Sequence, residues 1–480
     1  MGLLGLSQLE HLDLSMNNLN GSIPPEMGKL SNLQFLSLAS NQLTGEIPAK
    51  GLLSLSQLEH LDLSMNNLNE SIPPEIGKLS NLQSLSLAYN QLTGEIPAKG
   101  LLSLSQLEHL DLSMNKLNGN IPLEIGKLSN LQSFKNKLNG SIPPEIGKLS
   151  NLQSLSLYYN QLTGEIPPKG LLGLSQLKEL DLRENQLNGS IPPEMGKLSN
   201  LQFLSLASNQ LTGGIPAKGL SGLTQLEHLD LSNNYLNGSI PSQIYNLTKL
   251  KYLYLSNNSL SGTLSSEIGN LTKLKLLTLD DNNLRGLMPS EIGKLSNLHA
   301  LSLAYNGLTG EIPSSLQWLS RQKELGFLDL RDNKLSGMLD LSNNQLSGQI
   351  PSTLGNLTGL KSLNLSFNGL TGKIPTSLGE LKHMEILSLA HNMLSGEIPQ
   401  SFVKLGELTT LELSNNNLVG RIPMGGQMSS MANLDSYANN SGLCGIQIQV
   451  ECERAEASLG FHDDEEEDET WFSWEAILLG

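Results

Sequence analysis

The sequence has 480 residues and a formal net charge of −16, with 4% aromatic and 16% charged residues. So few aromatic residues argue against a globular core built on large rings, and they suit layers of leucine bordered by asparagine. Residues 451–480 hold eleven acidic side chains and one basic one, a charge of −10, so residues 1–450 contribute only −6. This balance argues against nucleic acid as a partner, because phosphate binding requires clustered lysine and arginine.

One short unit recurs along almost the whole chain. Residues 226–241 read LEHLDLSNNYLNGSIP, and the shared frame is L-x-x-L-x-L-x-x-N-x-L-x-G-x-I-P, a leucine-rich repeat. The asparagines of this frame are mostly 24 or 25 residues apart. The segment LEHLDLSMN returns every 49 residues at the start of the chain, which indicates recent tandem duplication. Similarity between these early copies therefore says little about function.

The residue pattern inside one unit predicts its local structure. Leu229 and Leu231 alternate with His228 and Asp230, which is the period of a β-strand with one buried face. Strands stacked about 4.8 Å apart would enclose their leucines in a continuous interior. Asn234 follows the strand, and its side chain is expected to satisfy backbone groups in the turn. Connecting segments such as PPEIGKLSN are too short for long helices. We therefore predict an α/β repeat solenoid, with a parallel β-sheet on the concave face and 3₁₀ or short helical turns on the convex face.

The period is interrupted at two places. Within residues 131–136 three strand residues are missing, and one step between frame asparagines shortens to 21 residues. Around residues 316–344 one step lengthens to 27 residues and the next shortens to 11. We expect a kink or a local loop at both interruptions.

Two kinds of residue bear on the cellular compartment. Cys444 and Cys452 allow either a disulfide in an oxidising compartment or two free thiols. Eleven N-x-S/T sequons are candidate glycosylation sites, although the repeat itself creates several of them as N-G-S. No signal peptide and no run of about 20 apolar residues occurs. The sequon asparagines are Asn20, Asn69, Asn139, Asn188, Asn237, Asn246, Asn257, Asn270, Asn356, Asn364 and Asn439.

The ending L-x-G-x-I-P separates this array from other leucine-rich repeats. From about Leu9 to Cys452 the chain resembles the plant-specific class found in plant cell-surface receptor-like proteins and receptor kinases. The segment LVGRIPMGGQMSSMANLDSYANNSGLCG is similar to the C-terminal cap of receptor-like proteins, which implies a disulfide between Cys444 and Cys452. The run DDEEEDE followed by WFSWEA is similar to their acidic juxtamembrane segment.

The resemblance divides the chain into three parts. Residues 1–423 are expected to form a solenoid of about 18 repeats, residues 424–452 the cap, and residues 453–480 an acidic juxtamembrane-like tail without fixed structure. The family's signal peptide, N-terminal cysteine-paired cap and membrane helix are not recognisable in the sequence. We therefore expect a receptor ectodomain truncated at both ends, on the extracellular side of the plasma membrane. It would contact the membrane only through a segment missing from this chain.

Histidine and aspartate recur two residues apart on the early strands, as in His11 and Asp13 or His60 and Asp62. Such pairs suggest a metal or acid–base ladder, but they lie in every second repeat, and no third ligand recurs beside them. A solvated face copied by duplication explains them better. We predict no metal, no cofactor and no enzymatic activity.

The outward strand positions offer a ligand-binding surface instead. Aromatic and charged side chains on a sheet otherwise lined by serine and alanine are typical of binding hot spots. The alternative is that exposed positions vary freely and carry no function. The predicted ligand-binding residues are Tyr158, Phe203, His228, Asp230, Lys251, Tyr252, Tyr254 and Asp280.

The resemblance implies a non-enzymatic receptor-like protein that binds a peptide, protein or glycan along the concave face. Because no kinase motif occurs in the sequence, such a protein would signal through a partner receptor kinase, in defence or development. Two alternatives remain open. One is a secreted inhibitor of a microbial cell-wall-degrading enzyme, a class of protein that is also built from similar repeats. The other is a non-functional truncated receptor copy.

Overall fold

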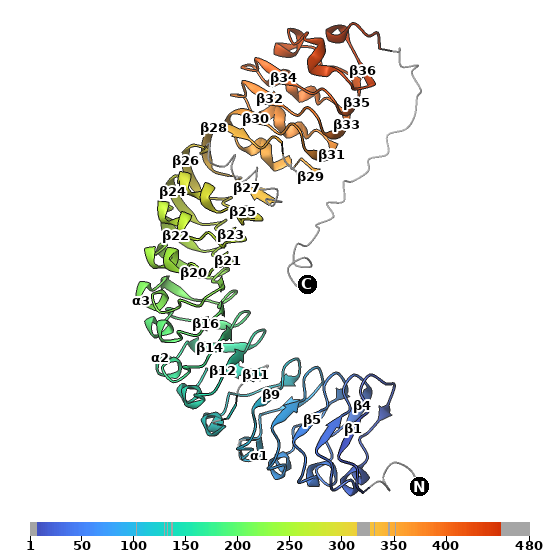
Figure 1. Cartoon of the computed structure of the whole chain (residues 1–480), viewed down its shortest axis with the longest axis vertical. Helices are drawn as coiled ribbons and strands as arrows, with labels where there is room; N and C mark the ends of the chain where they lie inside the picture. The colour runs from blue at the N-terminus through green and yellow to red at the C-terminus, as the bar shows by residue number, and fades with distance from the viewer. Residues whose placement is uncertain are drawn as a thin grey trace.

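The computed structural model describes residues 7–452, apart from residues 102, 129, 132, 136–137, 314–326, 331, 344–345 and 351. Figure 1 shows one curved superhelix in which the repeats follow one another from the N-terminal to the C-terminal end. Parallel strands line the concave side, and 3₁₀ turns with a few single-turn helices form the convex side. The predicted fold class, a plant-type leucine-rich repeat solenoid, is confirmed.

The main concave sheet has 14 parallel strands, one from each successive repeat. Each strand is only three residues long, and its central residue is buried in the core wherever the side chains are described. The strands are β1 (His11–Asp13), β3 (Phe35–Ser37), β5 (His60–Asp62), β7 (Ser84–Ser86), β9 (His109–Asp111), β11 (Ser133–Lys135), β13 (Ser154–Ser156), β15 (Glu179–Asp181), β17 (Phe203–Ser205), β19 (His228–Asp230), β21 (Tyr252–Tyr254), β23 (Leu276–Thr278), β25 (Ala300–Ser302) and β27 (Phe327–Asp329).

A second strand follows the frame asparagine in each repeat, and we call these the lateral strands. They pair with the lateral strands of neighbouring repeats in shorter parallel sheets. Over the same part of the chain they are β2 (Asn20–Gly21), β4 (Gln42–Gly45), β6 (Asn67–Leu68), β8 (Thr93–Gly94), β10 (Lys116–Leu117), β12 (Asn139–Gly140), β14 (Gln161–Glu165), β16 (Gln186–Asn188), β18 (Thr212–Gly214), β20 (Tyr235–Ser239), β22 (Ser259–Gly262), β24 (Asn283–Leu287) and β26 (Gly307–Glu311).

The convex elements are short because proline precedes or begins most of them and leucine ends the turn. They are η2 (Pro25–Lys29), η3 (Leu52–Ser54), η4 (Pro74–Lys78), α1 (Ala98–Leu101), η5 (Leu123–Lys127), η6 (Pro144–Lys148), α2 (Pro168–Leu171), η7 (Pro193–Lys197), α3 (Ala217–Leu220), η8 (Ser242–Asn246), η9 (Ser266–Asn270), η10 (Ser290–Lys294), η11 (Ser352–Asn356), η12 (Thr376–Glu380) and η13 (Gln400–Lys404).

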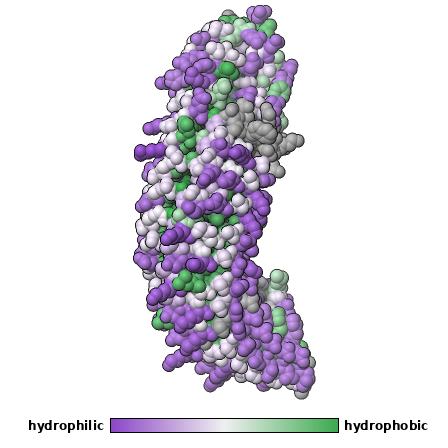
Figure 2. Space-filling model, turned by 60° about the vertical axis from the view of Figure 1, so that its left-hand side comes forward, coloured by the Kyte–Doolittle hydropathy of each residue, from purple (hydrophilic) through white to green (hydrophobic). Residues whose placement is uncertain are grey.

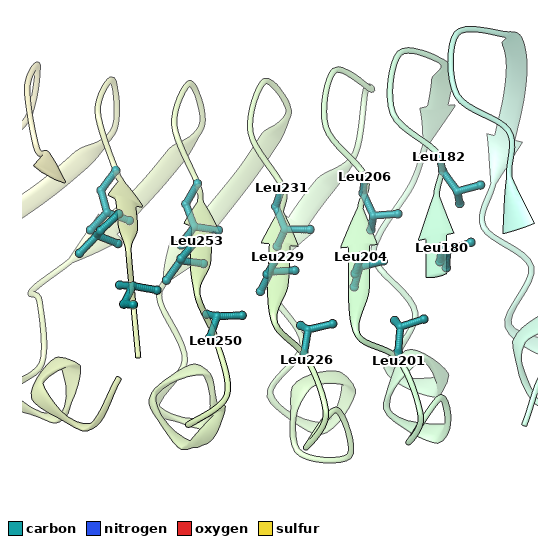
Figure 3. Close-up of a cluster of buried hydrophobic side chains, with 14 of the residues drawn as sticks. Leu180, Leu182, Leu201, Leu204, Leu206, Leu226, Leu229, Leu231, Leu250 and Leu253 are labelled. Atoms are coloured by element: carbon teal, nitrogen blue, oxygen red, sulfur yellow. The ribbon is translucent and has the colours of Figure 1, made fainter. Parts of the chain in front are cut away.

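The core is a set of leucine columns that run the length of the superhelix. Figure 3 shows Leu204, Leu229 and Leu253 side by side in one column, with Leu206 and Leu231 in the next. Leu229 is 0% exposed and Leu231 is 1% exposed. Burying a leucine side chain contributes roughly 1.5–3 kcal/mol. Because each leucine packs on its counterparts in the adjacent repeats, the stability of the fold comes from stacking.

The frame asparagines form a second column, as the sequence predicted. The Asn234 side-chain amide donates to the carbonyls of Leu206 (3.0 Å), Leu231 (3.3 Å) and Ser232 (3.1 Å). Its oxygen accepts the Leu211 N–H at 3.0 Å. One buried amide thus satisfies four backbone groups and links two repeats. The sequence did not show that the preceding residue, Asn233, turns the chain with a φ of 54°, a conformation that its counterparts in other repeats share.

The first interruption of the period leaves the concave sheet intact. Strand β11 pairs with both β9 and β13, and Ser133 lies in line with His109 and Ser154. The lateral layer is divided here, because β8 and β10 form one sheet while β12, β14 and β16 form another, and it is divided also between β6 and β8 and between β16 and β18, where the period is regular. Figure 1 shows the blue N-terminal repeats turned relative to the green repeats at this point.

At the second interruption a single strand, β28 (Lys334–Asp340), takes two roles. Its first residues pair with lateral strand β26, and its last residues pair with β30 (Gly359–Asn364) on the concave side. The register shifts between Gly337 and Met338. The shortened repeat therefore fuses the lateral strand of one repeat to the concave strand of the next.

Regular repeats resume after β28 and end in a cap. The remaining concave strands are β32 (Ile386–Ser388) and β34 (Thr410–Glu412), and the lateral strands are β29 (Ser347–Gln349), β31 (Gly369–Lys373), β33 (Met393–Glu397) and β35 (Asn417–Arg421). In the cap, β36 (Gly442–Cys444) pairs with β35, beside the turns η14 (Gly426–Ser429), η15 (Leu434–Tyr437) and η16 (Ile446–Ile448).

Cys444 and Cys452 are joined by a disulfide in the cap, with their Cα atoms 5.1 Å apart. The acidic tail expected over residues 453–480 lies outside the described residues. No helix within the described ranges is both long and apolar enough to cross a bilayer. Seen from the convex side, the surface is mainly hydrophilic, with small hydrophobic patches along its length (Figure 2).

Candidate ligand-binding surface

The parallel register of the concave sheet brings distant aromatic residues into one line. Phe203, His228 and Tyr252 occupy the first position of three neighbouring strands, β17, β19 and β21. Asp230 and Tyr254 share the third position of β19 and β21. Because first and third positions of a strand point to the same face, all five side chains project from the concave surface. We call Phe203, His228, Tyr252 and Tyr254 the ring cluster.

The rings of this cluster contact one another. The Phe203 and His228 rings are stacked, with centroids 4.4 Å apart and an interplanar angle of 21°. His228 also lies 5.7 Å from the Tyr252 ring and 5.3 Å from the Tyr254 ring, both tilted. Such ring pairs each contribute about 1 kcal/mol beyond area burial. The cluster is therefore a pre-arranged apolar surface on an otherwise polar sheet.

The packing of the cluster suppresses charge on His228. Burial, together with the nearby Arg183 guanidinium, lowers the pKa of His228 to about 4. Burial also raises the pKa of the Tyr254 hydroxyl to about 12, with Asp230 adding to the effect. At neutral pH both side chains are uncharged. Tyr254 keeps its proton and is available as a hydrogen-bond donor.

A buried carboxyl group, Asp181, and a half-buried one, Asp230, lie beside the rings. Burial raises the pKa of Asp181 to about 6, against the opposing influence of Arg183, whose Nε lies 3.2 Å from the Asp181 carboxylate. Burial likewise raises the pKa of Asp230, although the Ser232 hydroxyl donates to it at 2.6 Å. Acids that resist ionisation are frequent at functional sites, and structural networks also produce them.

The other predicted site residues lie around the ring cluster rather than within it. The Tyr158 ring lies under the Arg183 guanidinium, 5.3 Å away, two strands before β17. The Lys251 ammonium pairs with Glu227 at 2.6 Å, in the row before the strands. Asp280 accepts a hydrogen bond from the Ser256 hydroxyl at 2.8 Å. The structure thus brings together Phe203, His228, Asp230, Tyr252 and Tyr254, and it leaves the remaining three at the margin.

The predicted set omits Asp181 and Arg183, which link Tyr158 to the cluster. A signal for both exists in the sequence: LDLREN places an arginine where most other repeats carry alanine or serine and the preceding repeat carries Tyr158. In the structure, this arginine, Arg183, pairs with Asp181, two residues earlier in the same repeat. The pairing itself depends on side-chain conformations that a repeat pattern does not contain.

The histidines of the first repeats form a different arrangement. His11, Phe35 and His60 are stacked, with ring centroids 4.1 and 4.7 Å apart. Burial lowers the pKa of His60. Among the described residues, no group of three or more His, Cys, Asp or Glu side chains is arranged to hold a metal ion.

The candidate glycosylation sites are spread over several faces. Asn364 lies on concave strand β30, and its side-chain oxygen accepts bonds from the Ser366 N–H and hydroxyl. The side chain of Asn356 lies outside the described residues, and Asn139 and Asn364 are half-buried. The exposed ones are Asn20, Asn69, Asn188, Asn237, Asn246, Asn257, Asn270 and Asn439. Glycosylation itself stays a prediction.

Family comparisons agree with this architecture. The family described as Leucine rich repeat matches residues 56–117, 134–187, 150–211, 189–236, 199–260, 225–284 and 358–418. Two further leucine-rich repeat families match residues 31–76, and residues 8–30, 297–319 and 337–357. No curated protein matches the sequence significantly.

Solved structures of plant receptors are similar over most of the chain. The plant peptide hormone receptor RGFR1, in complex with RGF2, is 33% identical over 87% of this chain and 76% of its own, with a TM-score of 0.64. A TDR receptor is 32% identical over 92% and 86%, with a TM-score of 0.67. The Arabidopsis receptor kinase HAESA, in complex with the peptide hormone IDA and the co-receptor SERK1, is 31% identical over 94% and 88%, with a TM-score of 0.62. The chain therefore belongs to the leucine-rich repeat family, among the plant leucine-rich repeat receptor-like ectodomains.

Proposed function

We propose that this chain recognises a peptide ligand on its concave face, with the ring cluster as the anchor. The observation that carries the proposal is the set of contacting rings on β17, β19 and β21, beside the carboxyl groups of Asp181 and Asp230, whose pKa values are raised by burial. Two receptors of similar structure are described in complex with peptides, RGFR1 with RGF2 and HAESA with IDA. These relatives support a peptide in preference to a glycan.

The chemistry of the cluster indicates which part of a peptide it would hold. His228 is neutral, and its ring is covered by Phe203 on one side and by the tyrosines on the other. An apolar or aromatic ligand side chain would remove further ring surface from water, which favours binding. Asp280, at the edge, offers a carboxylate to a polar or basic neighbour in the same ligand.

The wider role follows from the same relatives. HAESA is described with a co-receptor, and we infer that this chain likewise acts with a partner receptor kinase at the extracellular side of the plasma membrane. In this proposal the chain contributes recognition and no catalysis. Defence and development are both compatible with such a receptor, and they differ in where the ligand originates.

The test is a binding screen of the full chain against plant and microbial peptides, followed by single substitutions. Tyr252→Ala and Tyr254→Ala are each expected to weaken binding of the selected peptide about tenfold or more, because central aromatic anchors dominate such interfaces. Tyr235→Ala is the matched control, since Tyr235 is 63% exposed on lateral strand β20 of an adjacent repeat unit. If both concave variants bind as tightly as the control, the ring cluster is not the site.

A further inference from the structure

A recess opens on the lateral sheet, on a different face from the ring cluster. It has a volume of about 610 Å³ and lies over β24, β26 and β28. Pockets that hold small ligands commonly enclose about 300–1,000 Å³. Among the residues that line it are Asn283, Arg285, Tyr305, Gly307, Thr309 and Lys334.

Strand pairing fixes the direction of the key side chains. Arg285 lies beside Gly307, and Thr309 lies beside Lys334. Partners in a parallel pair point to the same face, and so do residues two apart on one strand. Arg285, Thr309 and Lys334 therefore share one face of the lateral sheet, with the two cations on either side of β26. With about 4.8 Å between strands and an offset of two residues along them, the backbones of Arg285 and Lys334 are roughly 12 Å apart.

Gly307 lines the recess and leaves room there that a side chain would take. In most other repeats the equivalent position, directly after the frame asparagine, carries a larger residue, as in Gln186, Gln210 and Tyr235. A Cβ atom at Gly307 would lie 3.4 Å from Cγ of Arg285 and 3.1 Å from the Leu284 carbonyl oxygen. The aliphatic part of the Arg285 side chain therefore lies beside β26 at Gly307. A larger side chain at position 307 would occupy the same space.

The charges of Arg285 and Lys334 are not paired within the described part of the chain. Over the ranges that the structure describes, neither Arg285 nor Lys334 forms an ion pair, and both side chains are exposed. Asp281, Asp332 and Glu311 lie in neighbouring positions, but none of these carboxylates lines the recess. The described lining of the recess therefore carries two positive charges and no carboxylate, beside a tyrosine ring, an amide and a hydroxyl, while Glu311 lies two residues beyond Thr309 on the same strand.

We propose that this recess binds an acidic saccharide, such as an oligomer of a uronic acid. Arg285 and Lys334 would each engage a carboxylate, which is the strongest type of hydrogen bond available at a surface. Asn283 and Thr309 would exchange hydrogen bonds with ring hydroxyls between the two charges. The ring of Tyr305, which is 47% exposed, provides an apolar surface for the C–H face of a sugar.

A saccharide fits this recess better than an acidic peptide does. Extended peptides bind to sheets mainly by adding a strand to an open edge. Strand β26 is already paired with β24 on one side and β28 on the other. Its backbone therefore offers a peptide no strand edge, whereas saccharide hydroxyls need only side-chain partners.

The experiment is calorimetric titration of the full chain with trigalacturonic acid at low and high salt. We expect binding that weakens with salt. Arg285→Gln and Lys334→Gln should each weaken it about tenfold, as expected for loss of one charge-assisted contact. Lys373→Gln controls for loss of charge alone, because Lys373 is an exposed lysine on lateral strand β31, outside the recess. Tyr252→Ala should leave this binding unchanged, which separates it from ligand recognition on the concave face.

A second pair of variants tests the shape of the recess. Gly307→Gln should abolish trigalacturonate binding, whereas Gly369→Gln, at the equivalent position of β31, should not. A Cβ atom at Gly369 meets a carbonyl oxygen at 3.3 Å, so the two substitutions cost similar strain. Absence of trigalacturonate binding, or unchanged affinity in Gly307→Gln, overturns the proposal. Equal binding of triglutamate or of neutral maltotriose overturns the assignment to an acidic saccharide.

Discussion

The buried titratable residues distinguish the ring cluster from the rest of the concave face. His228 and Asp181 lie within two strands of each other, and burial shifts both toward the uncharged form, with pKa values of about 4 and about 6. The folded protein therefore holds an imidazole that resists protonation two strands away from a carboxyl group that resists ionisation. Their effects on stability have opposite dependence on pH, so each can be isolated by substitution.

We predict that His228→Gln reduces the loss of stability on acidification. The pKa of His228 is about 4 in the folded protein and near 6.5 in the unfolded chain, so between these values only the unfolded state takes up the proton. The contribution of His228 to the free energy of unfolding should therefore fall by about 2 kcal/mol as pH drops from 7 to 5, and His228→Gln should remove that fall.

Thermal or urea unfolding at pH 7 and pH 5 measures this difference. His109→Gln provides the matched control, because His109 holds an equivalent position on β9 but is exposed. An equal loss between pH 7 and pH 5 in the native protein and in His228→Gln would contradict the assignment.

At the level of the repeat element, one buried amide organises the turn. The frame asparagine satisfies backbone groups of two repeats, as Asn234 does for Leu206 and Leu211. Nearly the same bonds recur at Asn209, where the amide donates to Leu182 and accepts from Leu187. Because these hydrogen bonds join one repeat to the next, the asparagine couples neighbouring repeats, which also pack on each other through their leucines.

Asn234→Ala is predicted to lower the free energy of unfolding by about 3 kcal/mol, since it leaves one buried N–H and several carbonyls without a partner. Asn118→Ala, at an exposed lateral position, should change it by less than about 0.5 kcal/mol. Urea denaturation followed by circular dichroism measures both. A loss for Asn234→Ala as small as that for Asn118→Ala would show that water replaces the amide bonds.

The sequence predicts these elements well and their side-chain networks poorly. Alternation around Leu229 and Leu231 suffices to place His228 and Asp230 outward, so the ring cluster follows from period and register. The pair Arg183 and Asp181 does not follow, because it depends on side-chain conformations. The positive φ of the turn residue Asn233 could not be predicted for another reason. Its counterparts in other repeats include methionine, tyrosine and glutamate, and these residue types do not indicate a positive φ. Repetition imposes that conformation on them.

Over the whole molecule, the second interruption of the period divides the superhelix. The 14-stranded concave sheet ends at β27, and concave pairing resumes between β28 and β30 in a different sheet. Within the described part of the chain, β28 is the one strand that pairs on both sides of this division. The spacing of the repeats in the sequence located this division. The sequence predicted a kink or a loop there, and not a strand that is shared by the lateral and concave layers. To predict such a fusion from the sequence, one would have to know which half of the shortened repeat keeps its strand pairing.

This division predicts two cooperative units in unfolding. In repeat proteins, stability is nearly a sum over repeats and their nearest-neighbour contacts, so a weakened boundary separates the array. Met384, which is 0% exposed, lies after the division, and Leu229, also 0% exposed, lies before it. Truncating either to alanine costs about 2–5 kcal/mol locally. Hydrogen exchange read by mass spectrometry should show Met384→Ala accelerating exchange in β30–β35 only.

Leu229→Ala should give the opposite result, with faster exchange across β17–β21 and unchanged exchange after β28. The pair is matched, because both substitutions open a cavity in the same type of leucine-lined core. If either variant accelerates exchange over the whole chain, β28 couples the two parts fully and they unfold together. In that case binding at the ring cluster could stabilise the C-terminal repeats directly, whereas two independent units would require a ligand or partner that contacts both.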